Sequence, residues 1–122
     1  MGVVKQPPNS HDFSLRSVDR ITNPEACRVA EAIVAALPPG TDGGGCRAFW
    51  MPEQWRSRGE KYGLDSVLVV VCDGGGLAPY FNFDYGDAHA IETMKQALSA
   101  IGYYSEDCTG WYHAVYPCEV KQ

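Results

Sequence analysis

The sequence predicts an α+β fold: an antiparallel sheet of four to five strands, made of two β-hairpins, with two main helices packed on one face. Three observations support this class. Two segments repeat apolar residues with the period of a helix. A β-branched run at 66–72 ends in glycines, as a strand does before a hairpin turn. Two aromatic segments, 103–108 and 111–117, flank Thr109-Gly110, which predicts a second hairpin. Hairpins accompanied by long helices are typical of α+β domains.

The two main helices have start and stop signals in the sequence. Asn23 is a good N-cap and Pro24 suits the first turn, so the first helix is expected to begin there. Pro38-Pro39-Gly40 ends it. The second helix is expected to begin at Asp87 and to end before Gly102, a favoured residue after a helix. The apolar stripes are Ala26, Val29, Ala30, Ile33, Val34 and Leu37 in the first helix, and Ala90, Ile91, Met94, Ala97, Leu98 and Ile101 in the second.

The first hairpin is expected to begin with a strand that is covered on both faces, because the run at 66–72 is continuously apolar. Asp73-Gly74-Gly75-Gly76 is interpreted as its turn, and 77–84 as the return strand. Pro79 has no N–H group to donate. We therefore expect the return strand at an edge of the sheet or with a bulge.

The second hairpin sets which side chains face one another. A two-residue loop at Thr109-Gly110 places His113 opposite Glu106, and Cys108 falls on the same face as Glu106. The loop therefore predicts a cross-strand pair of a carboxylate and an imidazole.

Weaker signals mark the rest of the chain. A short strand is expected within 46–51 and a short helix at 52–61, which Gly59 weakens. Residues 1–12 are rich in proline and polar residues and are expected to be extended or mobile. Residues 13–122 are expected to form a single α+β domain.

Composition and charge exclude several functions. The chain has 122 residues and a net charge of −5, divided into +1 for residues 1–61 and −6 for residues 62–122. Nucleic-acid binding is disfavoured, because it needs a cluster of cations. No apolar run approaches the roughly 20 residues of a membrane helix. The N-terminus has no apolar leader, and the five cysteines show no paired spacing, so a cytoplasmic protein with reduced thiols is expected.

The aromatic residues carry the main functional signal. Nine of the fourteen lie within 80–85 and 103–116, and strand alternation places them on both faces of the sheet. Helices cover one face, so the other face needs a ligand, a second subunit or the N-terminal segment. The alternative is that these residues form an unusually aromatic core. The candidate ligand- or partner-binding residues are Tyr80, Tyr85, Tyr104, Trp111, Tyr112 and Tyr116, together with Arg56, Arg58 and Asp84.

Three functional hypotheses follow. The first is a small non-enzymatic accessory protein that forms a homodimer or binds a protein partner through the aromatic sheet. The second is a small-molecule-binding protein or small enzyme with a tyrosine-lined pocket between sheet and helices. The third is an acidic inhibitor of a protein that acts on nucleic acid. Neither of the two glycine-rich runs matches a nucleotide-binding motif, and no cofactor is expected.

The signals for catalysis and metal binding are weak. Glu106, His113 and Cys108 are candidates for a carboxylate, a general base and a nucleophile. Structural pairing across the hairpin explains them as well, so the chain is not expected to be an enzyme. Asp84, Asp87 and His89 are the weak metal candidates. Acidic residues at a helix start are explained more simply as caps, so no metal site is expected.

Overall fold

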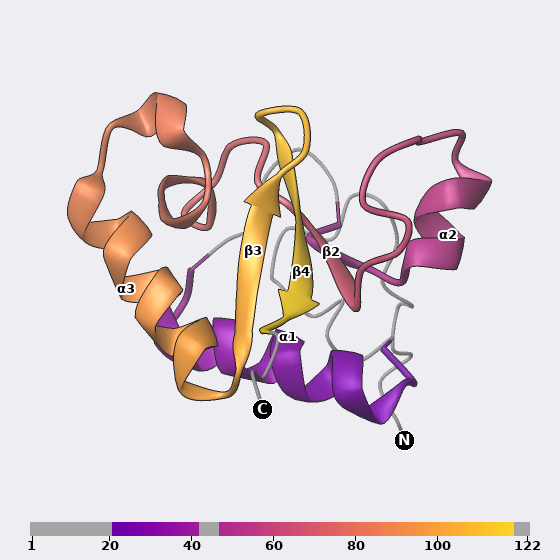
Figure 1. Ribbon diagram of the computed structural model, residues 1–122. Helices are drawn as coiled ribbons and strands as arrows, with labels where there is room; N and C mark the ends of the chain where they lie inside the picture. The colour runs from indigo at the N-terminus through magenta and orange to yellow at the C-terminus, as the bar shows by residue number, and fades with distance from the viewer. Residues whose placement is uncertain (1–20, 42–46, 119–122) are drawn as a thin grey trace, which may run out of the picture.

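The computed structural model describes residues 21–41 and 47–118, so the prediction for residues 1–12 lies outside the described residues. The α+β class is confirmed, with a four-stranded antiparallel sheet (Figure 1). In chain order the elements are α1 (Pro24–Ala36), β1 (Phe49–Trp50), α2 (Pro52–Ser57), β2 (Leu68–Val71), the 3-10 helices η2 (Ala78–Tyr80) and η3 (Phe83–Tyr85), α3 (Ala88–Ala100), β3 (Tyr103–Asp107) and β4 (Tyr112–Pro117).

Strand β2 lies inside the sheet. The strand order is β1-β2-β4-β3, so β2 pairs with β1 on one edge and with β4 on the other. Val70 pairs with Phe49 and with His113. All four residues of β2 are buried, as its continuous apolar run predicts.

Both main helices begin where the sequence predicts. The Asn23 side chain accepts a hydrogen bond of 3.0 Å from the backbone N–H of Ala26 and caps α1. The Asp87 side chain accepts one of 3.0 Å from Ala90 and caps α3. Each cap satisfies one of the backbone donors that a helix start leaves free. Gly102 follows α3 with a φ of +89°.

The two faces of the sheet carry separate apolar clusters. Leu68 and Val70 of β2 belong to a large cluster with Ile33 of α1 and Met94 of α3. Val69 and Val71 point to the opposite face, where they meet Trp50, Trp55 and Tyr112. We call this second group the tryptophan cluster. Figure 1 shows α3 at the left and α2, which carries Trp55, at the right.

The predicted first hairpin is wrong. Residues 77–85 form η2 and η3 instead of a strand, because β1 and β4 already occupy both edges of β2. Pro79 fits the first turn of η2, where its missing N–H group costs nothing. The Asn82 side chain caps η3 by accepting a hydrogen bond of 2.9 Å from the backbone N–H of Asp84.

The second hairpin is present, but its predicted register is wrong by one residue. Asp107 pairs with His113, and Glu106 pairs with Ala114. The loop therefore spans three residues, 109–111, and not two, because the N–H of Cys108 donates to the carbonyl oxygen of Tyr112 over 3.1 Å. A one-residue shift moves each side chain of one strand to the other face of its partner.

The short helix is shorter than expected. It ends at Ser57, and Gly59 has a φ of +96°, which no α-helix contains. The short strand is limited to two residues, and residue 46 of the predicted strand lies outside the described residues.

Candidate functional site

A pocket of about 430 Å³ lies between α3, the β3–β4 hairpin and the segment that forms η2 and η3. Its volume is within the usual range for small-molecule sites. Most of its wall is aromatic or aliphatic. The lining residues are Tyr80, Phe81, Phe83, Ile91, Met94, Lys95, Ser99, Tyr103, Tyr104, Ser105, His113 and Cys118.

The two 3-10 helices build one wall of this pocket. A return strand at 77–84 would have placed Tyr80 on the face opposite Phe81 and Phe83, whereas in the observed turns all three line the pocket. Phe81 and Phe83 both reach the same imidazole ring. Their ring centres lie 5.4 Å and 5.9 Å from that of His113, both in edge-to-face geometry. The departure from the predicted hairpin therefore creates part of the site.

His113 is a buried polar residue in the wall of the pocket. Its pairing with Asp107 directs it to the same face as Val115 and the large apolar cluster, and it is only 3% exposed. In the part of the chain that the structure describes, both ring nitrogens are shielded from solvent, and neither meets a partner at full hydrogen-bond geometry. A buried polar side chain without a partner is rare and costly.

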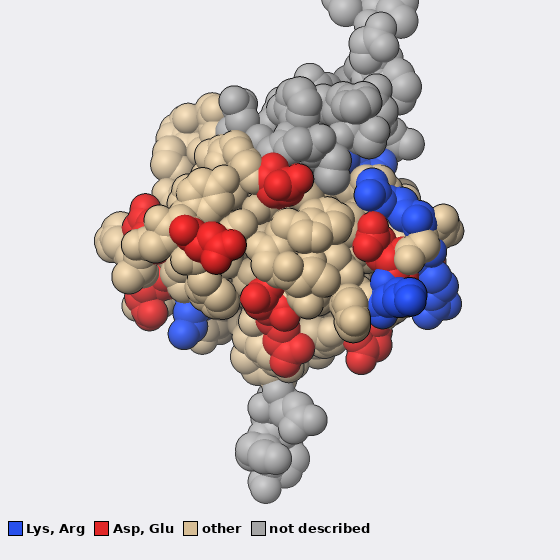
Figure 2. Space-filling model, turned by 90° about the horizontal axis from the view of Figure 1, so that it is seen from above, with Lys and Arg blue, Asp and Glu red and all other residues tan. Residues whose placement is uncertain are grey.

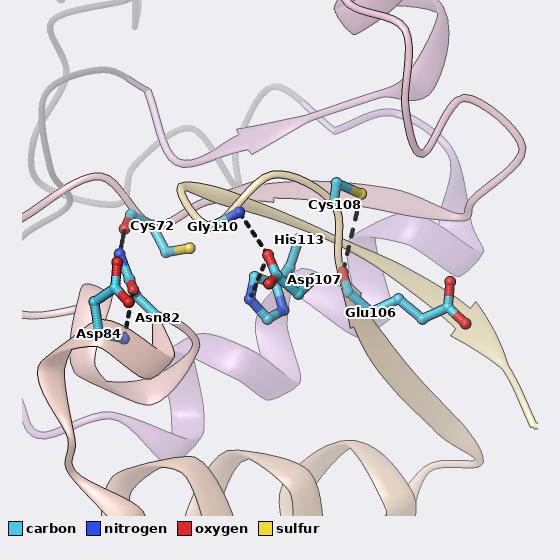
Figure 3. Close-up of polar contacts among 8 residues, drawn as sticks. All are labelled: Cys72, Asn82, Asp84, Glu106, Asp107, Cys108, Gly110 and His113. Atoms are coloured by element: carbon cyan, nitrogen blue, oxygen red, sulfur yellow. Dashed lines mark hydrogen bonds and ion pairs between the residues drawn. The ribbon is translucent and has the colours of Figure 1, made fainter.

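Asp107 is the charged group beside His113. Its Oδ1 atom lies 3.8 Å from Nε2 of His113, which is longer than a hydrogen bond, as Figure 3 shows. The same oxygen accepts a hydrogen bond of 2.6 Å from the backbone N–H of Gly110, so the turn fixes the carboxylate. Burial lowers the pKa of His113, against the opposing effects of the Asp107 charge and of a weak hydrogen bond with the backbone of Phe81. The imidazole is therefore neutral at pH 7.

Tyr103 contributes its ring but not its hydroxyl to the pocket. The hydroxyl donates to the Glu25 carboxylate and accepts from Arg28 over 3.1 Å, both on α1. The hydrogen bond to Glu25 raises the pKa of Tyr103. These contacts hold β3 against α1, so this wall of the pocket is fixed by the fold.

The predicted grouping of Glu106, His113 and Cys108 is not assembled. Glu106 pairs with Ala114, so its side chain lies on the face opposite His113 (Figure 3). Cys108 packs against the tryptophan cluster. Burial and the nearby Asp107 raise the pKa of its thiol to about 11. A thiol with a raised pKa is a poor nucleophile at neutral pH.

The predicted metal candidates serve the ends of helices. The side chain of Asp87 caps α3, whereas Asp84 and His89 are exposed. Within residues 21–41 and 47–118, no group of three or more His, Cys, Asp or Glu side chains is placed to hold a metal ion.

The predicted binding residues are distributed over three places. Tyr80 and Tyr104 line the pocket. Trp111 and Tyr112 pack with Trp55, at ring-centre distances of 5.8 Å and 4.9 Å. Tyr112 is therefore buried in the tryptophan cluster and Trp111 is half-buried against it, on the face away from the pocket.

Tyr116 and Tyr85 lie outside both sites. Tyr116 stacks on Tyr104 with ring centres 5.7 Å apart, and its hydroxyl donates to Asp65 over 3.0 Å. Burial and that carboxylate raise the pKa of Tyr116. Tyr85, in η3, is 49% exposed.

The predicted arginines lie on the α2 side of the molecule. Arg56 is exposed in the last turn of α2. Arg58 lies 4.8 Å from the ring of Trp55 and forms an ion pair of 3.5 Å with Glu60. Figure 2 shows the blue side chains gathered mainly at the right, whereas the acidic side chains are spread over the visible face.

Several pocket residues were missed by the sequence reasoning. Phe81 and Phe83 fall in the return strand predicted at 77–84, whereas in the structure they lie in and beside two 3-10 helices and line the pocket. The one local signal was Pro79, which has no N–H group for a strand ladder and fits the first turn of η2. No sequence signal set the length of the β3–β4 loop.

No protein-family model matches this chain, and neither the curated proteins nor the solved structures include a significant match. In the described ranges, every helix is too short or too polar to cross a membrane. The functional assignment therefore rests on the geometry of the pocket.

Proposed function

We propose that this protein binds a small, largely apolar molecule in the pocket between α3 and the β3–β4 hairpin. One observation carries the proposal: a pocket of about 430 Å³ is lined mainly by aromatic and aliphatic side chains. A ligand that fills such a pocket removes its own apolar surface and that of the wall from water.

The proposal is one of binding and not of catalysis. Cys108, the predicted nucleophile, lies on the other side of the sheet, and its thiol is protonated at neutral pH. Asp107 lies 3.8 Å from His113, so it does not orient the ring by a hydrogen bond. These features support a pocket that holds a ligand.

The test is a fluorescence titration with prodan, an uncharged naphthalene dye that brightens and shifts to the blue in apolar surroundings. We expect saturable binding of one dye per chain. Ile91 lies on α3 and lines the pocket, so Ile91→Trp fills it and is expected to weaken binding at least about tenfold.

The matched control is Gln96→Trp. Gln96 is exposed on the same helix and does not line the pocket, so this variant adds the same ring elsewhere and is expected to bind as the natural chain does. Circular dichroism confirms that both variants are folded. The proposal fails if the natural chain gives no saturable signal, or if Ile91→Trp binds the dye unchanged.

A second candidate function is binding to a protein partner or to a second copy of the chain. The supporting observation is a set of exposed aromatic side chains: Tyr62 is 58% exposed, Phe83 60% and Tyr104 42%. Aromatic residues are enriched at interfaces. Analytical ultracentrifugation between 1 and 100 µM distinguishes this candidate (concentrations chosen on the order of a weak dimer's dissociation constant). A monomer at every concentration contradicts self-association.

A cytoplasmic location is part of the proposal. Among the described residues, Cys72, Cys108 and Cys118 form no disulfide. Burial raises the pKa of the Cys72 thiol to about 12, which keeps it protonated. Free thiols fit a reducing compartment. A gel-shift assay with a thiol-reactive reagent on freshly lysed cells tests this, and disulfide-linked cysteines would contradict it.

A further inference from the structure

The wall that α3 gives to the pocket changes from apolar to polar along the helix. Ile91, Lys95 and Ser99 lie one turn apart from each other, and all three line the pocket. Eight residues of α-helix span about 12 Å, so this row follows the pocket over much of its length. Ile91 and Phe83 also line a shallower hollow beside the start of α3, so Ile91 marks the end of the pocket near Phe83.

The two ends of the pocket differ in their chemistry. One end lies at Phe83, whose ring centre is 5.9 Å from that of His113. The other end lies where the chain turns from α3 into β3. There the N–H of Gly102 donates to the carbonyl oxygen of Ser99 over 3.0 Å, and the N–H of Cys118 donates to the carbonyl oxygen of Gly102 over 2.8 Å. The pocket therefore has an aromatic end and an end with hydroxyl and thiol groups.

Lys95 places a positive charge between these two ends. It is the one charged residue among the described lining residues, and it is exposed. A lysine lays its carbon chain along an apolar wall and keeps its ammonium group in water. In the described ranges, that ammonium group forms no ion pair with a carboxylate. The pocket therefore offers a ligand an apolar interior and one cation at its mouth.

The nearby carboxylates lie outside the lining of the pocket. Asp87 and Glu92 line the neighbouring hollow, and Asp107 lies beside His113 at the aromatic end. A cation inside the pocket would lose its hydration without a counter-ion from the described lining residues. An anion at the mouth gains Lys95 as its counter-ion and stays in contact with water. The charges therefore favour a ligand with an apolar body and an anionic head.

We propose that the ligand is a carboxylic acid with an apolar body, which fills the aromatic end of the pocket while the carboxylate pairs with Lys95 at the mouth. This inference rests on the proposed function, because it names the ligand class of the same pocket. The apolar body supplies most of the affinity by leaving water. The carboxylate orients the ligand and keeps much of its hydration, because Lys95 is exposed.

The experiment compares three probes that share a naphthalene ring and differ in charge. At neutral pH, 1-naphthylacetate is an anion, 2-(1-naphthyl)ethanol is uncharged and 2-(1-naphthyl)ethylamine is a cation. Each is titrated against the full chain by displacement of prodan. We expect the acetate to bind at least about fivefold more tightly than the alcohol, and the amine to bind most weakly. The preference for the acetate is expected to decrease as salt is added, because ions screen an exposed pair.

Variants of Lys95 assign this preference to one side chain. Lys95→Met keeps a similar length without the charge, and is expected to bind the acetate and the alcohol within about twofold of each other. Lys95→Arg restores the charge and is expected to keep the preference. The matched control is Lys61→Met. Lys61 is exposed in the segment after α2 and does not line the pocket, so this variant makes the same change in net charge and is expected to bind as the natural chain does.

Three kinds of result would overturn the inference, and they are separable. Equal binding of the acetate and the alcohol, or an unchanged preference in Lys95→Met, contradicts the carboxylate assignment but leaves the pocket as a ligand site. Tightest binding of the amine contradicts an anionic ligand and points to Asp87 and Glu92. If prodan and all three naphthalenes fail to bind, the proposed function itself is wrong.

Discussion

The burial of the His113 imidazole destabilises the fold. The side chain is 3% exposed, and its nitrogens meet no partner at full hydrogen-bond geometry within the described chain. Natural proteins keep such costs at functional sites, where stability is exchanged for binding. Removing the polar atoms at this residue therefore gives a test that separates folding from function.

We expect His113→Phe to raise the free energy of unfolding at pH 7 by about 1–2 kcal/mol. The phenyl ring has a similar size and shape, and it removes two buried polar atoms that have no partner at full hydrogen-bond geometry in the described chain. Urea denaturation followed by circular dichroism measures the change. A loss of more than about 1 kcal/mol would mean that His113 is a satisfied part of the core.

The pH dependence of stability gives a second test of the same residue. The folded pKa of His113 lies below its ordinary value of 6.5, so the unfolded chain binds a proton at a higher pH than the folded chain. The contribution to stability is therefore complete above pH 6.5 and is lost as the pH falls toward the folded pKa. The slope reaches about 1.4 kcal/mol per pH unit.

Urea denaturation at several pH values between 5 and 8 (a range about the ordinary histidine pKa) measures this slope. His113→Phe keeps every other titrating group, so the difference between the two proteins isolates His113. Parallel stability curves for the two proteins would show that the imidazole is not held neutral by burial.

At the scale of the elements, the tryptophan-cluster face is closed by a tight backbone approach at Gly63. Its φ is +76°, and a Cβ atom there would lie 2.9 Å from Cβ of Ala114 and 3.2 Å from Sγ of Cys108. Gly59 also has a positive φ, of +96°, but a Cβ atom there meets nothing within 4 Å. Comparing the same substitution at the two glycines therefore distinguishes the effect of backbone strain from the effect of steric overlap.

We expect Gly63→Ala to destabilise the protein by at least about 1 kcal/mol more than Gly59→Ala. Both variants place an alanine at a positive φ, which is strained, but only Gly63→Ala also forces the loop away from β4. Thermal unfolding of the two variants side by side measures the difference. Equal losses would show that the loop before β2 does not pack on β4 as described.

Substitutions at the start of α3 distinguish two interpretations of its acidic residues, helix capping and metal binding. The Asp87 side chain caps the helix, so Asp87→Ala is expected to lower the free energy of unfolding by about 0.5–2 kcal/mol. Asp84→Ala is the control: only the backbone of Asp84 makes a capping bond, and a change within about 0.5 kcal/mol is expected.

Urea denaturation with and without EDTA checks the Asp87 and Asp84 variants. A loss of stability that appears only when the chelator is absent would favour the metal interpretation over the capping one. The capping interpretation predicts the same loss under both conditions.

The sequence was sufficient to predict the elements whose signals lie within a few residues of one another. Asn23 and Asp87 mark helix starts through short-range hydrogen bonds, and β2 is recognisable from its own apolar run. The segment at 77–84 was misassigned because its structure depends on β1 and β4, which are distant in sequence. A non-local choice of strand partners leaves little trace in local residue patterns.

At the scale of the whole molecule, the candidate site depends on two such non-local features. Because β2 pairs with β1 and β4, residues 77–85 form two 3-10 helices that build a pocket wall. The three-residue loop directs His113 and Asp107 to the same face. Tyr80 and Tyr104 were predicted as binding residues, but their position beside His113 followed only from the assembled fold.

The tryptophan cluster shows what covers the face of the sheet opposite the pocket. Trp50, Trp55 and Tyr112 cover the middle of that face, so part of it is packed by the chain itself. The aromatic residues thus divide between an internal cluster, a pocket and exposed sites. Of these places, the pocket is the one that combines aromatic walls with a cavity large enough for a small molecule.

The most direct measurement is the side-chain ¹⁵N NMR spectrum of the histidines during a titration with prodan. The chain has three histidines, and His89 is an exposed internal reference. Binding in the pocket is expected to shift the imidazole signals of His113 in proportion to occupancy, while those of His89 stay unchanged. Saturable binding of the dye with no change at His113 would contradict a ligand site at this pocket.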